Sequence, residues 1–197
     1  MSTILFLVRH ANTFEQGEQP YWVGAQQDLA LSNSGRAQLP ALKRRVLARL
    51  EVENYTPARL ITSPLKRARE TADIFEIPVQ IDQRLRELDF AAWANKTDKE
   101  ILALGSKAEA ELRAWRETSK LPESWALDET ALHTELSQFL NDQRSKSPNT
   151  TIAVTSNGIL KLIGKILQGP GAWNVQTANF CELELIAESW RINGWNQ

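Results

Sequence analysis

Three polar clusters in the sequence carry residue types that bind anions. Arg9 and His10 form the first cluster, and Arg67 belongs to the second. Asn157 and Gly158 form the third. A guanidinium presents a planar fork of donors that matches phosphate oxygens and does not lose its charge. The first backbone N–H groups of a helix also attract anions. Two arginines beside a histidine, with helix N-termini nearby, would therefore form a strong anion pocket.

The three clusters follow short apolar runs, which are typical of buried strands in a parallel sheet. These runs cover residues 4–8, 59–61 and 151–154, and a helical pattern comes after each of them. In an open α/β sheet, ligands bind in the crevice at the carboxyl ends of the strands. We therefore expect the three clusters, with Asn12 and Thr13 of the first, to converge at one edge of the sheet.

Apolar residues at helical spacing indicate the elements that cover the sheet. Ser32 is an N-cap for a helix that runs to residue 50, and Ser63 before Pro64 opens a helix that runs to residue 75. Further helices are predicted over residues 128–142 and from residue 158 to the end before Gly169.

Residues 88–125 interrupt this alternation with two short helical patterns and three tryptophans. They indicate a small helical cap inserted over one edge of the sheet. Late strands are expected at residues 182–187 and 190–192. We therefore predict a single α/β domain over residues 1–197, a three-layer sandwich whose sheet is mostly parallel and has helices on both faces.

Composition excludes several other classes of protein. The 23 basic and 24 acidic side chains nearly cancel, which argues against a nucleic-acid-binding protein. The single Cys181 cannot form an intramolecular disulfide and fits a reducing cytoplasm. Two histidines and one cysteine argue against a Cys/His zinc site. The apolar run at residues 4–8 is too short to span a membrane and lacks the flanks of a signal peptide.

Four ordered blocks resemble the signatures of the histidine phosphatase (phosphoglycerate mutase-like) superfamily. Residues 7–10 with Thr13 resemble its Arg-His-Gly signature, and residues 31–35 with Gln38 its Leu-Thr-x-x-Gly-x-x-Gln block. Two further blocks resemble the Ser-x-Leu-x-Arg-Ala-x-x-Thr stretch and the Glu-Leu-Asp-Phe-Gly-x-Trp-Glu-Gly-x-Thr stretch of its α-ribazole phosphatase branch: residues 63–71, and residues 84–90 with Trp93 and Lys96-Thr97.

The resemblance implies phosphoryl transfer through a phosphohistidine, without metal or cofactor. His10 would be the nucleophile, and Arg9 and Arg67 would stabilise the charge on the transferring group. Glu87 would protonate the leaving oxygen and then activate water. The expected substrate is a small phosphorylated metabolite, and inorganic phosphate is the expected product. The predicted binding set comprises Arg9, Arg67, Asn157, Gly158, Asn12, Thr13 and, as a wall of the pocket, Trp22.

Several positions depart from the signatures. Asn157 stands where the superfamily has a second pocket histidine, so a charged donor is replaced by a neutral one. Losing a charge-assisted bond costs about 1–3 kcal/mol, which corresponds to a roughly 5- to 150-fold slower turnover. Ala11 and Ala91 replace two signature glycines, and Ala94-Asn95 replaces Glu-Gly. We expect the methyl group of Ala11 to lie beside the pocket.

These departures leave three functions open: a phosphatase, a degenerate member that binds a phosphorylated ligand without turnover, and a phosphoglycerate mutase. Structural roles also compete for individual residues. His10 could be an ordinary strand-end histidine, Glu87 could pair with Arg84 or Arg86, and Asn157 could simply begin a turn. The sequence does not name the substrate or the oligomeric state.

Overall fold

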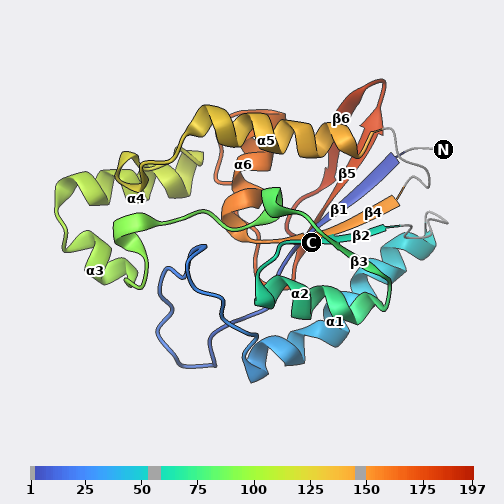
Figure 1. Cartoon of the computed structure of the whole chain (residues 1–197), viewed down its shortest axis with the longest axis horizontal. Coiled ribbons are helices and arrows are strands. Elements are labelled where there is room, and N and C mark those ends of the chain that lie inside the picture. The colour runs from blue at the N-terminus through green and yellow to red at the C-terminus, as the bar shows by residue number, and fades with distance from the viewer. Residues whose placement is uncertain (1–2, 53–58, 145–149) are drawn as a thin grey trace.

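One mixed sheet forms the centre of the protein in the computed structural model, which describes residues 3–52, 59–144 and 150–197 (Figure 1). Within these residues the strand order is β3-β2-β4-β1-β5-β6. The first four strands pair in parallel, whereas β5 and β6 are antiparallel. The strands are β1 (Thr3–Arg9), β2 (Arg59–Thr62), β3 (Val79–Ile81), β4 (Thr150–Thr155), β5 (Phe180–Ile186) and β6 (Ser189–Gly194).

The carboxyl ends of β1, β2 and β4 lie at the same level of the sheet. Arg9 of β1 is opposite Thr155 of β4, and Thr62 of β2 is opposite Val154. The N–H group of His10 still donates to the Thr155 carbonyl at 2.9 Å, so the ladder extends one residue beyond β1. The chain therefore leaves the three strands side by side, which places the polar clusters at one edge.

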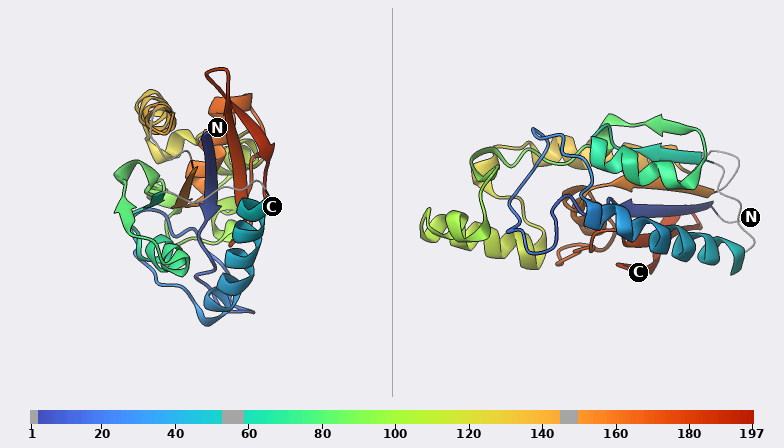
Figure 2. Two further views of the ribbon diagram at one scale, coloured as in Figure 1. Left: turned by 90° about the vertical axis from the view of Figure 1, so that its right-hand side faces the viewer. Right: turned by 90° about the horizontal axis from the view of Figure 1, so that it is seen from below.

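Helices cover both faces of the sheet, and alternate strand residues divide the core between the two faces (Figure 2). Ile4, Phe6 and Val8 of β1 belong to the hydrophobic cluster of one face, and Leu5 and Leu7 to the cluster of the other. All five are at most 1% exposed, as a strand buried on both faces requires. The predicted three-layer α/β sandwich is confirmed. The covering helices are α1 (Asn33–Val52) and α2 (Lys66–Ala72) on the first face, and α5 (Glu129–Asp142) and α6 (Asn157–Gln168) on the second.

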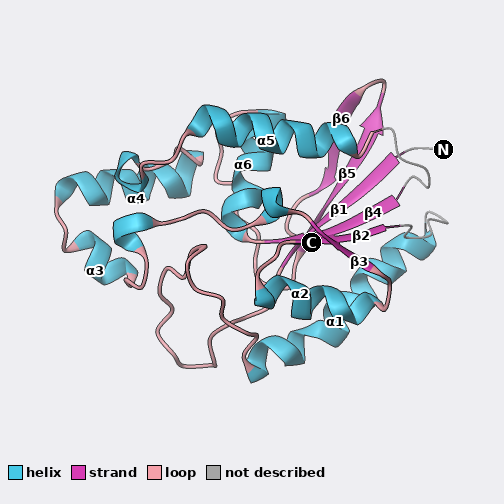
Figure 3. Ribbon diagram, in the orientation of Figure 1, coloured by secondary structure: helices cyan, strands magenta, loops and turns pink. Residues whose placement is uncertain are grey.

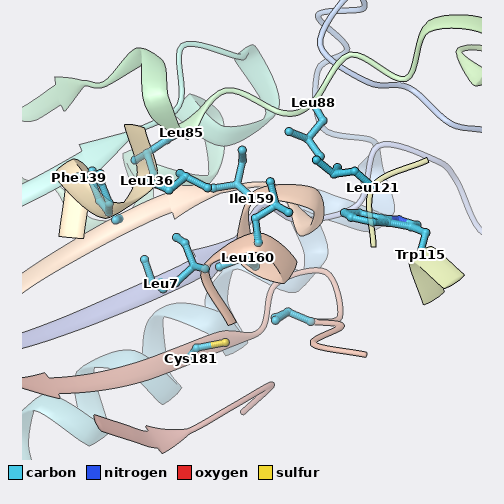
Figure 4. Close-up of a cluster of buried hydrophobic side chains, with 14 of the residues drawn as sticks. Leu7, Leu85, Leu88, Trp115, Leu121, Leu136, Phe139, Ile159, Leu160 and Cys181 are labelled. Carbon is cyan, nitrogen blue, oxygen red and sulfur yellow. The ribbon is translucent and has the colours of Figure 1, made fainter. Parts of the chain in front are cut away.

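Residues 88–125, which we call the cap, lie beyond the carboxyl ends of the strands, at the left of Figure 1. Neighbouring aromatic rings, most of them edge to face with centroids between 4.7 and 5.8 Å apart, hold the cap together. The hydrophobic cluster continues from Trp115 and Leu121 to Ile159 of α6 (Figure 4). The helical elements of the cap are α3 (Asp98–Leu102), α4 (Ser106–Thr118) and the 3-10 turns Ala91–Trp93 and Glu123–Trp125.

Residues 10–32 connect β1 to α1 without a helix or strand (Figure 3). Backbone hydrogen bonds join this connecting loop to the cap. Trp22 exchanges bonds with Lys96 and Asn95 at 2.9 and 2.8 Å, and the Ala25 N–H group donates to the Leu88 carbonyl at 2.9 Å. The connecting loop and the cap therefore form one continuous wall above the sheet edge.

Two predictions of local structure are wrong. The helix expected from Ser63 begins only at Lys66, with Leu65 as its N-cap, and continues from residue 73 as a 3-10 turn. Ser63 instead accepts a hydrogen bond from the Leu65 N–H group at 3.4 Å, so it stabilises the turn before the helix. The short edge strand β3 was not predicted, because three exposed residues are too few for the alternation of Val79, Gln80 and Ile81 to indicate a strand. None of the helices among the described residues is long and apolar enough to cross a bilayer.

Candidate active site

A cavity of about 580 Å³ lies at the carboxyl ends of the strands, where the polar clusters converge. Arg9 ends β1 and His10 follows it, while Arg67 lies in the first turn of α2. Asn157 and Gly158 begin α6. All five residues line the cavity, because the parallel strands release them at one edge. The fold therefore brings the residues of the predicted anion pocket together from three separate segments.

His10 is held as one defined neutral tautomer. The carbonyl oxygen of Ala11 can only accept, so Nδ1, which lies 2.8 Å from it, carries the proton. Nε of Arg67 can only donate, so Nε2, at 3.2 Å, carries the lone pair. Burial lowers the pKa of His10 well below its usual value, and the charges of Arg67 and Arg9 lower it further. At neutral pH the imidazole is therefore uncharged, with a nucleophilic nitrogen beside Arg67.

Arg67 is nearly fully buried, and backbone carbonyls fix its guanidinium plane. Nη1 donates to the Gln27 carbonyl and Nη2 to the Gly24 carbonyl, both at 3.0 Å. Its own carbonyl accepts from the Thr71 hydroxyl at 2.8 Å, which locks the first turns of α2. With the Nε–H group bonded to His10, three of the five N–H groups have partners, and two remain.

Arg9 is anchored on one side and unpaired on the other. Nη1 donates to the Val175 carbonyl at 2.6 Å. Nε is buried and has no hydrogen-bond partner in the described part of the chain. Burial lowers the pKa of Arg9 to about 10, so the side chain stays charged at neutral pH. A buried unpaired donor is costly to maintain.

Glu87 is a buried carboxyl group that faces the two arginines across the cavity. Oε1 accepts from the Leu88 N–H group at 3.0 Å, and Oε2 from the Gly158 N–H group at 3.4 Å. Burial raises the pKa of Glu87 above its usual value, although Arg67, the two backbone N–H groups and Arg9 oppose the shift. A carboxyl group with a raised pKa is suited to donate a proton near neutral pH.

Arg84 and Arg86, the sequence neighbours that could form an ion pair with Glu87, have other partners. Arg84 binds Asp82 at 2.6 Å and Asp142 at 2.8 Å, and Arg86 donates to the Ala25 carbonyl at 2.9 Å. The alternative in which Glu87 serves only as an ion-pair partner of its sequence neighbours is therefore wrong.

Asn157 and Gly158 are held at the start of α6 by different contacts. Oδ1 of Asn157 accepts from the Val175 N–H group at 2.9 Å, and Nδ2 donates to Asn174 Oδ1 at 3.4 Å. A Cβ at Gly158 would lie 2.3 Å from Oε1 of Glu87, so the close approach of this carboxyl group requires glycine. The Gly158 N–H group, expected to face phosphate, is directed at Glu87.

The sequence profile of the histidine phosphatase superfamily (branch 1) matches residues 5–197 of the chain. The chain belongs to this superfamily. No curated protein matches its sequence.

Solved structures of several phosphatases share the fold. A mycobacterial glucosyl-3-phosphoglycerate phosphatase in complex with inorganic phosphate superposes with a TM-score of 0.76 at 21% identity, over 99% of this chain and 97% of that one. A phosphoserine phosphatase from Entamoeba histolytica in complex with 3-phosphoglyceric acid gives 0.79 at 18% identity, over 99% and 97%. At such identities the likeness concerns the fold.

The structure accounts for three departures from the superfamily signature. Ala11 was expected beside the pocket, and this is wrong: its side chain is fully buried in the core cluster on the α1 and α2 face. Ala91 and Asn95, which replace signature glycines, both have left-handed backbones with φ of 45° and 65°. Asparagine tolerates this conformation well, whereas alanine is strained in it.

The remaining predicted residues, Asn12, Thr13 and Trp22, line the cavity. Nε1 of Trp22 donates to Asp98 Oδ1 at 2.9 Å, which fixes the indole against the cap. Trp93, the tryptophan of the fourth signature block, does not line the cavity: it is only 1% exposed and packs against Trp22.

Sequence reasoning missed most of the outer wall, because its residues come from the connecting loop and the cap and follow no motif. The one available signal was the position of Trp115 on the apolar stripe of α4, which indicates a buried side chain. The described residues contain no group of three metal-ligating side chains. The missed lining residues include Phe14, Glu15, Glu18, Tyr21, Asp98 and Trp115.

Proposed function

We propose that this histidine phosphatase superfamily member hydrolyses a small phosphorylated metabolite through a phosphohistidine at His10. The observation that carries the proposal is the tautomer of His10. Nδ1 donates to the Ala11 carbonyl and Nε2 accepts from Arg67, so Nε2 carries the lone pair. This nitrogen lies where two arginines can hold a phosphoryl group. This is the arrangement that attack on phosphorus requires.

In the first step Nε2 of His10 forms a bond to phosphorus, and the bond from phosphorus to the ester oxygen breaks. Before the attack, the Nε–H group of Arg67 gives up its hydrogen bond to Nε2 of His10 and donates to a phosphate oxygen instead. The guanidinium groups of Arg9 and Arg67, which line the cavity, bind the equatorial oxygens, where charge develops in the transition state. Protonated Glu87 gives its proton to the leaving alkoxide.

In the second step the Glu87 carboxylate takes a proton from water, and the water oxygen attacks phosphorus. The bond from phosphorus to His10 breaks, which returns the neutral imidazole and releases inorganic phosphate. The directions of the two pKa shifts support this cycle. The lowered pKa of His10 keeps the nucleophile unprotonated, and the raised pKa of Glu87 favours the protonated form of the acid. No step needs a metal ion.

Hydrolysis of p-nitrophenyl phosphate in the presence of a chelator tests the proposal. His10→Ala should abolish turnover, whereas His133→Ala should leave it unchanged, because the chain's other histidine is an exposed residue of α5. Quenching in alkaline detergent, in which a phosphohistidine survives, should trap a labelled phosphoenzyme in the wild type and in His133→Ala only. Full activity in His10→Ala would show that another nucleophile acts.

A second candidate function is binding of a phosphorylated ligand without turnover, and the neutral Asn157 favours it. Asn157→His would restore the charged donor of the superfamily signature. An inactive wild type that becomes active on this substitution would identify a ligand-binding protein on a disabled enzyme fold. Wild-type turnover lost only in His10→Ala would instead show a phosphatase in which asparagine suffices.

A further inference from the structure

Lys161 is a fully buried lysine in α6, and the proposed chemistry makes no direct use of it. Lysine is rarely buried without a partner for its charge. Its ammonium group donates to the carbonyl of Ala172, to the carbonyl of Arg116 at 3.5 Å and to Asn174 Oδ1 at 3.3 Å. Burial lowers its pKa to about 8, and the nearby charge of Arg116 adds to this effect. The side chain therefore remains mostly charged at neutral pH.

The ammonium group fixes the side-chain amide of Asn174, and a backbone N–H group fixes that of Asn157. The ammonium group can only donate, so the atom that Asn174 presents to it must be the oxygen. The same oxygen accepts from Nδ2 of Asn157 at 3.4 Å. Oδ1 of Asn157 in turn accepts from the Val175 N–H group at 2.9 Å. Both amide flips are thus fixed by groups that cannot reverse their roles.

This orientation decides what Asn157 offers to the cavity. Its oxygen is used by Val175, and one N–H group is used by Asn174. The second N–H group has no partner in the described segments, and Asn157 lines the cavity with Arg9 and His10. The Val175 carbonyl also holds Nη1 of Arg9, so one short segment orients two phosphate donors. A flipped amide would present an oxygen to the phosphate and repel it.

We propose that Lys161 is a positioning residue for phosphate binding. Its ammonium group fixes Asn174, and Asn174 holds the Asn157 amide with an N–H group available to the phosphate. Lys161 also places a positive charge one helical turn from Asn157, the residue that replaces the second histidine of the superfamily signature. The inference rests on the phosphate site of the proposed function, but it does not require turnover.

A purely structural role for Lys161 makes a different prediction. The ammonium group lies 4.9 Å from the centroid of the Trp115 ring and bonds the carbonyls of Arg116 and Ala172, so it also joins α4 to α6. If this were its only role, its removal would lower stability and would act independently of Asn157. Coupling between Lys161 and Asn157 therefore distinguishes the two roles.

The test is a double-mutant cycle of Lys161→Met and Asn157→Ala, read by calorimetric binding of inorganic phosphate to the full chain. Asn157→Ala should weaken binding about 5- to 10-fold, which is the range expected for one lost hydrogen bond to an anion. Lys161→Met should weaken it about fivefold in the wild type but less than about twofold in the Asn157→Ala background. The matched control is Lys165→Met, one turn further along α6, where the lysine pairs with Glu129 at the surface and phosphate affinity should not change.

Equal losses in both backgrounds, or no loss in Lys161→Met, would overturn the positioning role. If Lys161→Met does not fold, Asn174→Ala provides the same cycle, because Asn174 is exposed and its removal breaks the link without burying a cavity. Phosphate binding without phosphatase turnover would refute the proposed function, and the cycle would still decide the inference. A wild type that does not bind phosphate would overturn both.

Discussion

The two ends of the cavity are built on different principles. At the inner end, His10, Arg67 and Glu87 are each at most 8% exposed. Each also bonds a main-chain group, respectively the Ala11 carbonyl, the Gln27 and Gly24 carbonyls, and the Leu88 and Gly158 N–H groups. Side chains fixed in this way lose little freedom when a ligand arrives, as preorganised electrostatic catalysis requires.

The outer end comes from the connecting loop and the cap. Its carboxylates, unlike Glu87, lie at or near the surface. Glu18 is exposed, and Asp98 is shared between Nε1 of Trp22 and an ion pair with Arg116. Five aromatic side chains also line this end: Phe14, Tyr21, Trp22, Phe90 and Trp115. The comparison teaches that substitutions at the inner end should change kcat, whereas substitutions at the outer end should change KM and substrate preference.

The largest effect is expected from Glu87→Gln at the inner end. Loss of the general acid should lower kcat by about 10²- to 10⁴-fold for alkyl phosphates, whose leaving alkoxide needs a proton. The loss should be much smaller for p-nitrophenyl phosphate, because its leaving phenolate is stable without one. Steady-state kinetics with both esters measures the ratio. Equal losses for the two esters would remove Glu87 from the role of general acid.

The pH profile should report the same two inner groups. Activity needs unprotonated His10 and protonated Glu87. Because the pKa of His10 is lowered, the acid limb lies below the range of an ordinary histidine. Because the pKa of Glu87 is raised, kcat/KM for alkyl phosphates falls with rising pH above the range of an ordinary glutamate. The alkaline limb should disappear in Glu87→Gln. A wild-type rate that rises steadily from about pH 5 to pH 8 would indicate an ordinary histidine instead.

A smaller effect is expected from Glu18→Lys at the outer end. Reversing this exposed charge should lower KM about fivefold for phosphate esters that carry an additional carboxylate, and should leave kcat unchanged. The KM for phosphate esters whose alcohol part is uncharged should change much less, and added salt should weaken the effect. Glu51→Lys, at the opposite end of α1, is the control. A changed kcat in Glu18→Lys would contradict the division between the two ends.

The smallest effect is expected in the cap, away from the reacting atoms. Ala91→Gly should relieve the left-handed backbone strain and raise the free energy of unfolding by about 0.5–1 kcal/mol. Thermal unfolding should then occur about 2 °C higher, without a change in kcat for p-nitrophenyl phosphate. Ala94→Gly should destabilise instead, because φ of Ala94 is −54°. Similar shifts for both substitutions would mean that strain is not the cause.

Most of the architecture could be predicted from the sequence. The buried strands β1, β2 and β4 have short apolar runs, and the helices that follow them have apolar stripes, although the predicted cap of α2 is wrong. The edge strand β3 could not be predicted, because an exposed strand of three residues is too short for its alternation to be distinguished from chance. The same limit applied to the outer wall of the cavity. The indole of Trp115 reaches the cavity only because the cap packs against the connecting loop.

The sequence by itself determined which residues gather at the sheet edge, because parallel strands release their carboxyl ends on one side. It also determined the superfamily, through ordered blocks of residues that carry specific chemistry. Only the tertiary structure decided how those residues are set. The tautomer of His10 and the bonds of Glu87 depend on groups distant in the chain. The link from Lys161 to Asn157 depends on a segment folded back over α6. Hydrogen bonds between segments leave no periodic signal in a sequence, since each depends on the final position of both partners.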